Sequence, residues 1–244
     1  MRGLTPYASA FAAFFSRAYD FVRMAAISRA SIRIAGSHAG VVTGEDGPSQ
    51  MALEDIAMFR AVFGSTVLYP SDANQAAQLV ALAADNPGIT YLRLTRADTP
   101  VIYSADETFA IGGSRLLRSS ALDEVTVVAA GITVHEALRA AATLAEEGVN
   151  VRLLDLYSIK PLDSETLLSA VRATDGRLVT VEDHWSEGGL GDAVLDALAP
   201  SGIPLRCVKL AVRKMPGSGP PPELLAAAGI DSEAIIAAVR AATA

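Results

Sequence analysis

The prediction of the fold starts from one stretch of the sequence, Ser37-His-Ala-Gly-Val-Val-Thr-Gly-Glu-Asp-Gly-Pro-Ser-Gln50. It follows a short apolar run, Ile32–Gly36, and it precedes a segment with helical periodicity. Its three glycines and one proline argue against regular structure, and glycine lets a chain turn sharply and pass close to a neighbour. We therefore expect a loop that holds polar side chains in fixed positions.

A loop between a strand and a helix is where open parallel sheets bind ligands, because backbone amides and helix N-termini gather there. Pro48 suits the first position of a helix, which we expect over Pro48–Val62. Glu45 and Asp46 lie just upstream, where the positive end of that helix favours negative charge. A purely structural explanation, in which the acids cap the helix and His38 is an ordinary loop residue, fits the composition equally well.

The composition narrows the class of protein. The chain has 244 residues, a formal net charge of −7 and no acidic or basic block, which disfavours nucleic acid and anionic membrane surfaces as partners. No apolar stretch reaches the length of a membrane span. The single cysteine, Cys207, lies in an apolar run, so we expect a buried strand residue and a reducing compartment such as the cytoplasm. With three histidines and one cysteine, we assign no metal ligands.

Helices and strands alternate along the first half of the chain. Residues Thr5–Ala26 carry apolar side chains, Phe11 and Phe14 among them, at offsets of three and four, which predicts an amphipathic helix. The other elements expected in this half are strands over Ile32–Gly36, Thr66–Tyr69 and Ile89–Thr95 and a helix over Ala73–Ala84 with Asp72 as its N-cap.

The pattern weakens after Arg96, and we expect a linker over 109–122 between a first domain, 1–108, and a second domain, 123–244. The elements expected in the second domain are strands over Val125–Ala130, Val149–Leu156, Leu178–Val181 and Leu205–Leu210 and helices over Val134–Glu146, Ser164–Ala173, Leu190–Leu198 and from Asp231 to about Ala242. Such alternation calls for parallel strands joined by helical crossovers. We therefore predict an α/β fold with two doubly wound domains.

We expect a purely structural role for two further features of the second half, a glycine-rich segment and His135. The glycines that follow Glu182-Asp183-His184-Trp185 lack the full spacing of a nucleotide-binding loop, so we expect a tight strand-to-helix turn there. His135 has no thiol partner nearby in the sequence, and we assign it a structural role.

Several segments resemble the C-terminal part of the transketolase family. Those similar to its pyrimidine-binding domain are Phe11-Ala-Ala-Phe-Phe-Ser-Arg-Ala18, Arg23-Met-Ala-Ala-Ile-Ser28, Gly36-Ser-His38 and Gly44-Glu-Asp-Gly-Pro-Ser-Gln-Met-Ala-Leu-Glu-Asp55. Those that extend the resemblance over nearly the whole chain are Tyr69-Pro-Ser-Asp72, the strand ending in Arg96, Ile159-Lys-Pro-Leu-Asp163 and Val181-Glu-Asp-His184. The resemblance implies a truncated, parallel-sheet pyrimidine-binding domain followed by a mainly parallel-sheet C-terminal domain. Gln50, where many bacterial members carry histidine, indicates the animal-type branch.

The resemblance also implies an activity, namely transfer of a two-carbon ketol unit between sugar phosphates in the pentose phosphate pathway, on thiamine diphosphate with Mg²⁺. It places Phe14, with Phe11 beside it, and Gln50 at the cofactor. A flat apolar ring suits such an aromatic platform independently of the resemblance.

The substrate positions implied by the resemblance are His38 and Asp46 at the sugar and Arg96 at its phosphate, with His38 as the catalytic residue. A guanidinium fork matches a phosphate, and an imidazole can relay a proton near neutral pH.

By the alignment of motifs, the family's catalytic glutamate would precede Met1, and the diphosphate-binding domain with its Mg²⁺ ligands would lie elsewhere. We therefore expect a chain that is inactive until an N-terminal transketolase region or subunit completes it, and that then works as a homo-oligomer. A fragment of a longer reading frame is favoured over a split-gene subunit, and a degenerate inactive chain is the third explanation. A non-catalytic interaction or regulatory module and a related thiamine enzyme, such as deoxyxylulose-phosphate synthase, are the alternative functions.

Overall fold

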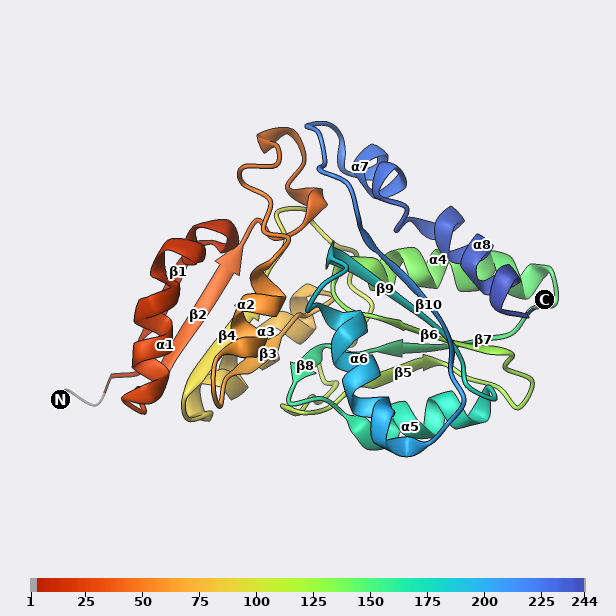
Figure 1. The fold of residues 1–244 in the computed structure, drawn as a ribbon, viewed down its shortest axis with the longest axis horizontal. Helices are drawn as coiled ribbons and strands as arrows, with labels where there is room; N and C mark the ends of the chain where they lie inside the picture. The colour runs from red at the N-terminus through yellow and green to blue at the C-terminus, as the bar shows by residue number, and fades with distance from the viewer. Residues whose placement is uncertain (1–3, 244) are drawn as a thin grey trace.

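Two five-stranded sheets lie side by side in the computed structural model, which describes residues 4–243 (Figure 1). The first sheet has the order β1-β2-β4-β3-β8. Its strands are β1 (Tyr7–Phe11), β2 (Ile32–Ser37), β3 (Thr66–Leu68), β4 (Ile89–Arg93) and β8 (Ser158–Lys160). The first four are parallel, and β8 pairs antiparallel with β3. Because β8 comes from the second half of the chain, that half completes the first sheet.

The second sheet has the order β10-β9-β6-β7-β5 and is parallel except for the pairing of β5 with β7. Its strands are β5 (Arg115–Arg118), β6 (Val125–Ala129), β7 (Val151–Asp155), β9 (Arg177–Trp185) and β10 (Arg206–Val212). Helices α4 (Ile132–Glu146) and α8 (Ser232–Thr243) cover one face, and α5 (Ser164–Ala173) and α6 (Leu190–Leu198) cover the other (Figure 1). The predicted doubly wound α/β fold is confirmed.

The remaining elements connect and cover the strands. They are the 3-10 helices η1 (Ala12–Ala18), η2 (Val41–Asp46) and η3 (Ala199–Ser201) and the helices α1 (Tyr19–Ile27), α2 (Asp55–Ala61), α3 (Ala73–Asp85) and α7 (Pro221–Ala228). The segment predicted as a linker, 109–122, contains β5, which joins the second sheet. The domain boundaries stay a prediction.

Two predicted elements of the first half are wrong in part. The helix expected over Thr5–Ala26 begins only at η1, because Tyr7–Phe11 pairs in parallel with the edge of β2 as strand β1. The helix expected from Pro48 begins only at Asp55. The residues before Asp55 serve other contacts, since Ala52 bridges to Ala39 and Leu53 accepts a hydrogen bond from the backbone N–H of Trp185 (2.8 Å).

Other expectations of local structure are confirmed. Asp72 caps α3, its Oδ1 accepting from the backbone N–H of Gln75 (2.8 Å), and Asp231 does the same for α8 through Ala234 (3.0 Å). The glycines after β9 form the tight turn that leads into α6. Cys207 lies on strand β10 as predicted, but it is half-buried rather than buried, because β10 is the edge strand of its sheet.

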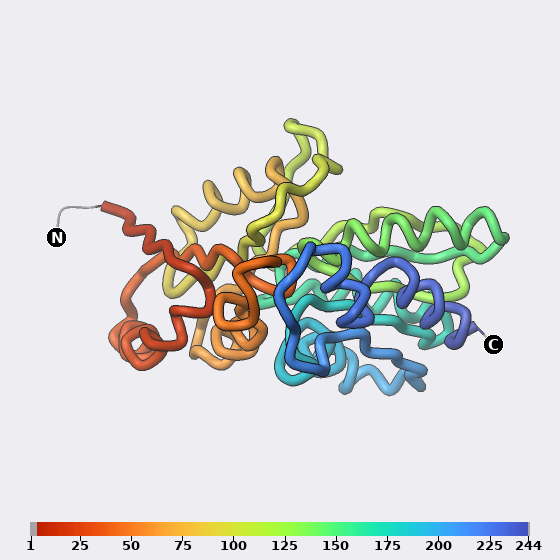
Figure 2. Tube along the Cα trace, turned by 90° about the horizontal axis from the view of Figure 1, so that it is seen from above, coloured from red at the N-terminus to blue at the C-terminus, as the bar shows by residue number. Residues whose placement is uncertain are grey.

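One hydrophobic core cluster extends across both sheets, from Ile34 on β2 and Phe59 on α2 to Val128 on β6 and Leu153 on β7. The molecule is elongated along the line that joins the two domains, with the first at one end and the second at the other (Figure 2). Burial of a shared apolar core, together with β8, fixes the two domains against each other.

Candidate functional site

An aromatic stack lies where the carboxyl ends of β1 and β2 meet. The ring of Phe11 lies parallel to that of Phe14 in η1, with centroids 5.5 Å apart and an angle of 3° between the planes. The ring of Phe11 also stacks on that of His38, with centroids 3.8 Å apart and an angle of 10° between the planes. The register explains this, because Phe11 pairs with Ser37 and His38 is the next residue. The side chain of Phe14 is half-exposed, so one end of the stack is open to a ligand.

His38 stands in a turn with an unusual backbone. Its φ is +56°, a left-handed conformation that costs most residues about 1 kcal/mol or more. The surrounding hydrogen bonds hold this turn, since Thr43 Oγ1 donates to the carbonyl of His38 (2.7 Å) and the N–H of Ala39 donates to Leu94 (3.1 Å). The Nδ1 of the imidazole lies 3.1 Å from Ser37 Oγ. The ring is therefore fixed both by stacking and by its own backbone.

Arg96 and Asp46 lie together at the far side of the same turn. Nη1 of Arg96 donates to the carbonyl of Thr43 (2.9 Å), and it lies 3.1 Å from Glu45 Oε2 and 3.8 Å from Asp46 Oδ1. Thr43 therefore links the arginine to His38. The guanidinium is partly exposed, and its present partners are acids whose place an incoming anion could take.

Gln50 lies beyond this strip, in the turn that follows η2. Its backbone N–H donates to Gly47 (3.1 Å), and its side-chain oxygen accepts from Ser49 Oγ. A hollow of about 350 Å³ opens next to this turn, and Phe14, Pro48, Trp185 and Met215 are among the residues that line it. Two of these come from the second domain.

The structure therefore brings five of the six predicted site residues into one connected strip, Phe14–Phe11–His38–Thr43–Arg96–Asp46, and places Gln50 near its end. They do not all surround one cavity. Of these residues only Phe14 lines the neighbouring hollow. The arrangement is an open surface on which half of a binding site could be built.

A buried polar cluster beneath the strip escapes sequence reasoning. Arg93 on β4 is fully buried, and its Nε donates to Asp55 Oδ2 (2.9 Å), which also accepts from Tyr91 Oη (2.6 Å). Nη2 of Arg93 donates to the backbone carbonyl of Asp183 on β9 (2.7 Å), so the cluster joins the two domains. Burial raises the pKa of Asp183 to about 6 and lowers the pKa of the adjacent His184 to about 4. The one sign of this cluster in the sequence is Arg93, a charged residue at the end of an otherwise apolar strand.

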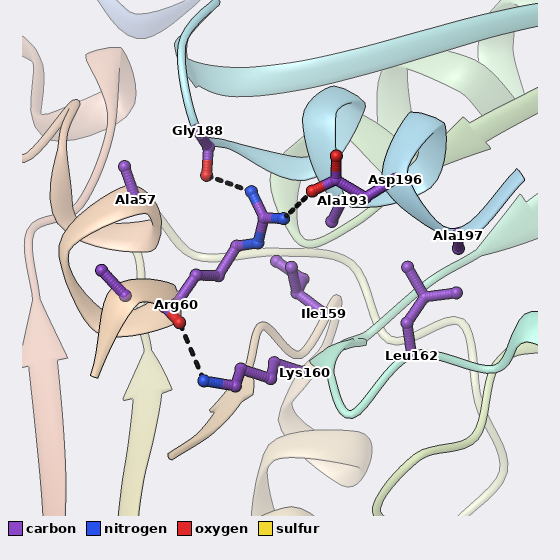
Figure 3. A pocket seen from close by; sticks show the side chains of 10 residues that line it. Ala57, Arg60, Ile159, Lys160, Leu162, Gly188, Ala193, Asp196 and Ala197 are labelled. Carbon is purple, nitrogen blue, oxygen red and sulfur yellow. Dashed lines mark hydrogen bonds and ion pairs between the residues drawn. The ribbon is translucent and has the colours of Figure 1, made fainter. Parts of the chain in front are cut away.

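A larger hollow of about 580 Å³ lies between α2, β8 and α6 (Figure 3). Its basic side chains already have partners. Arg60 donates to the carbonyl of Gly188 (2.6 Å) and pairs with Asp196 (2.9 Å), and Lys160 Nζ donates to the carbonyls of Arg60 and Val62 (2.8 Å each). We therefore assign this hollow to the domain contact and not to ligand binding.

The part of the chain between residues 4 and 243 contains no cluster of three or more His, Cys, Asp or Glu side chains that could hold a metal ion. Over the same residues, every helix is too short or too polar to cross a bilayer.

Comparison with known proteins decides the family. Residues 1–101 match the transketolase pyrimidine-binding domain, and residues 114–235 match the transketolase C-terminal domain. The chain belongs to the transketolase family. It is 52% identical to human transketolase over 236 residues, which cover 96% of this chain and 38% of that protein. It is 51% identical to mouse transketolase-like protein 2, covering 98% of this chain and 38% of the relative.

A solved structure described as a split-gene transketolase, an inactive β4 tetramer, is similar to nearly the whole of this chain. It has a TM-score of 0.90 and 37% sequence identity, and the match covers 99% of this chain and 77% of that one. The predicted resemblance, including its animal-type character, is confirmed. This chain spans 38% of the length of the human transketolase and of the mouse transketolase-like protein 2.

Proposed function

We propose that this chain supplies the pyrimidine-binding and C-terminal parts of a thiamine diphosphate-dependent transketolase, and that it works only when an N-terminal region or subunit completes it. The completed enzyme transfers a two-carbon ketol unit between sugar phosphates. The observation that carries the proposal is the strip in which an open aromatic stack, a histidine and an arginine follow one another.

The residues present fit the cofactor. Thiamine diphosphate, when bound, supplies the carbanion chemistry, whereas the protein orients and polarises the reactants. Phe14 offers a half-exposed ring face for an aminopyrimidine, and Phe11 supports that face from behind. Gln50 would lie at the rim of the same region. Mg²⁺ and its ligands would belong to the completing region.

The sugar would lie along the rest of the strip. Because Ser37 Oγ lies at Nδ1 of His38, Nε2 is the nitrogen available to exchange a proton with a sugar hydroxyl. Asp46 would accept a hydrogen bond from another hydroxyl. The phosphate would replace Glu45 as the partner of Arg96, since a phosphate carries more charge and matches the guanidinium fork.

Apolar side chains on the outer face of α1 support the need for a partner. Phe21, Met24 and Ile27 are all exposed, and a surface of this kind marks an interaction site. This face also favours the second candidate, a non-catalytic assembly module. The high identity to transketolases favours that family over the related synthase, whose activity was the other alternative.

Reconstitution tests the proposal. This chain is mixed with the N-terminal region of the human relative, thiamine diphosphate and Mg²⁺, and ketol transfer from xylulose 5-phosphate is followed. We expect no transfer by either part alone and transfer by the mixture. A mixture that associates on a sizing column but transfers nothing would favour the assembly module instead.

A further inference from the structure

The turn that carries His38 is held by a residue of the other domain. Asp183 lies on β9, in the second sheet, and its Oδ1 accepts a hydrogen bond from the backbone N–H of Val41 (2.8 Å). Val41 is three residues after His38 and begins η2. The C-terminal domain therefore contacts the backbone between the histidine and the residues that meet Arg96.

The fit between this carboxylate and the turn is close. Gly40 has a φ of +81°, and a Cβ at this position would lie 1.7 Å from Asp183 Oδ2, so only glycine allows the approach. The neighbouring N–H of Gly40 donates to Ala52 (2.9 Å). The turn is thus fixed from the first domain at Ala52 and from the second domain at Asp183.

The side-chain carboxylate of Asp183 makes a single hydrogen bond within the part of the chain that the structure describes. Asp183 is buried, and among residues 4–243 its Oδ2 has no hydrogen-bond partner, so the bond to Val41 is the single one that the carboxylate makes. Its backbone is held in turn, because Nη2 of Arg93 donates to the Asp183 carbonyl (2.7 Å). A buried carboxylate is costly, and a nearby arginine reduces that cost. The one hydrogen bond that this carboxylate accepts from the described residues is therefore the one that holds the turn at Val41.

We propose that Asp183 is a positioning residue through which the C-terminal domain sets the orientation of His38. The left-handed backbone of His38 needs outside support, and the bond from Val41 supplies support that the first domain alone does not. The proposal rests on the proposed function in one respect, namely that His38 contacts the sugar. The contact itself is a property of this chain and can be tested without any activity.

Nuclear magnetic resonance on the full chain tests the contact, because only three histidines are present. In Asp183→Ala, we expect the ring signals of His38 to move and amide exchange at Val41 to become at least about tenfold faster, since the amide loses its acceptor. In Asp183→Asn, the remaining oxygen can still accept, so both should return close to wild type. For the Asp183 variants, His135, whose Nε2 lies 2.7 Å from the Ser71 carbonyl and away from the turn, is the internal reference.

Asp155→Ala is the matched control, because Asp155 is also a buried carboxylate on the second sheet but does not touch the turn. It should destabilise the fold without moving His38 or speeding exchange at Val41. The proposal is overturned if Asp183→Ala leaves both readouts at wild-type values, or if Asp155→Ala changes them equally. Should Asp183→Ala not fold, Asp183→Ser, whose hydroxyl is too short to reach Val41, takes its place with the same expectations.

The reconstituted enzyme separates this proposal from the proposed function. There, Asp183→Ala should lower kcat/KM by at least about tenfold, with rescue by Asp183→Asn, because a displaced catalytic group loses its alignment. If the mixture is inactive but the resonance results hold, the proposed function fails and the positioning contact stands. If the mixture is active and Asp183→Ala is as active as wild type, the positioning role fails.

Discussion

Replacement of Asp155 by Asn tests how the domain contact depends on pH. Asp155 ends β7 in the second sheet, and its Oδ2 accepts hydrogen bonds from Tyr103 Oη (2.6 Å) and from Gln75 Nε2 (3.1 Å), both in the first half of the chain. Burial raises the pKa of this carboxyl to about 6 and outweighs the two hydrogen bonds, which lower it. The folded protein therefore disfavours the ionised form.

The size of the effect of pH on the free energy of unfolding follows from the difference between the pKa of Asp155 in the folded and unfolded protein. The carboxyl has a pKa of 3.8 in an exposed chain and about 6 in the folded one, so the folded state binds more protons between these values. The free energy of unfolding then falls as the pH rises from about 4 to about 6 and is level above that. A rise in the carboxyl pKa from 3.8 to about 6 on folding corresponds to about 3 kcal/mol over the full pH range.

Asp155→Asn removes this dependence on pH. The free energy of unfolding of the wild type, compared with that of the variant at the same pH, should therefore fall by about 2 kcal/mol between pH 4 and pH 8. Urea unfolding at a series of pH values measures the difference. Tyr103→Phe is the matched comparison, because it removes a donor that lowers the pKa and should steepen the dependence. A difference between wild type and Asp155→Asn that is constant over this range would refute the reasoning.

Three further predictions use other parts of the molecule. Arg93→Leu leaves Asp55 buried without its cation and should cost about 3 to 5 kcal/mol in urea unfolding. Lys160→Met removes the donor to the last carbonyls of α2 and should cost about 1 to 3 kcal/mol, measured by thermal unfolding. Arg96→Ala in the reconstituted enzyme should weaken phosphorylated donors by roughly 10- to 100-fold more than unphosphorylated ones in steady-state kinetics, as expected for loss of a charged hydrogen bond.

Each of these has an outcome that contradicts it. Wild-type stability in Arg93→Leu would mean that the buried pair contributes nothing net, and the same result in Lys160→Met would remove its role at the end of α2. Equal losses for phosphorylated and unphosphorylated sugars would place Arg96 away from the phosphate.

The second domain was largely predictable because its elements have complete local signals. α5 runs over Ser164–Ala173 as expected, since Asp163 precedes it as N-cap and its apolar side chains recur at helical spacing. The strand β6, Val-Thr-Val-Val-Ala, is buried on both faces and is a nearly continuous apolar run. Where a segment's own pattern and its tertiary contacts agree, sequence is sufficient.

The first domain shows where local pattern fails. Tyr7–Phe11 is mostly exposed, so nothing in its side chains distinguishes a strand from the start of a helix, and the pairing with β2 decides. β8, Ser158–Lys160, is too short to give a pattern and joins a sheet whose other strands are far away in sequence. α7 was not predicted either, because two prolines open it and hide its helical spacing.

The candidate site was predictable only in part. The resemblance located Phe11, His38 and Arg96, and parallel strand ends brought them together. Asp183 could not be found in this way, because its partner, Val41, is 142 residues away and contributes a backbone N–H that no side-chain pattern reveals.

The central claim is that this chain supplies the surface on which the ring of thiamine diphosphate stacks. Calorimetric titration of thiamine diphosphate with Mg²⁺ into the mixture of this chain and the human N-terminal region tests it most directly. We expect one cofactor bound per chain and at least about fivefold weaker binding in Phe14→Ala, since aromatic stacking contributes about 1 kcal/mol beyond area burial. Binding should be unchanged in Phe63→Ala, whose side chain is exposed after α2. Binding as tight in Phe14→Ala as in the wild type, or no binding by the mixture, would contradict the claim.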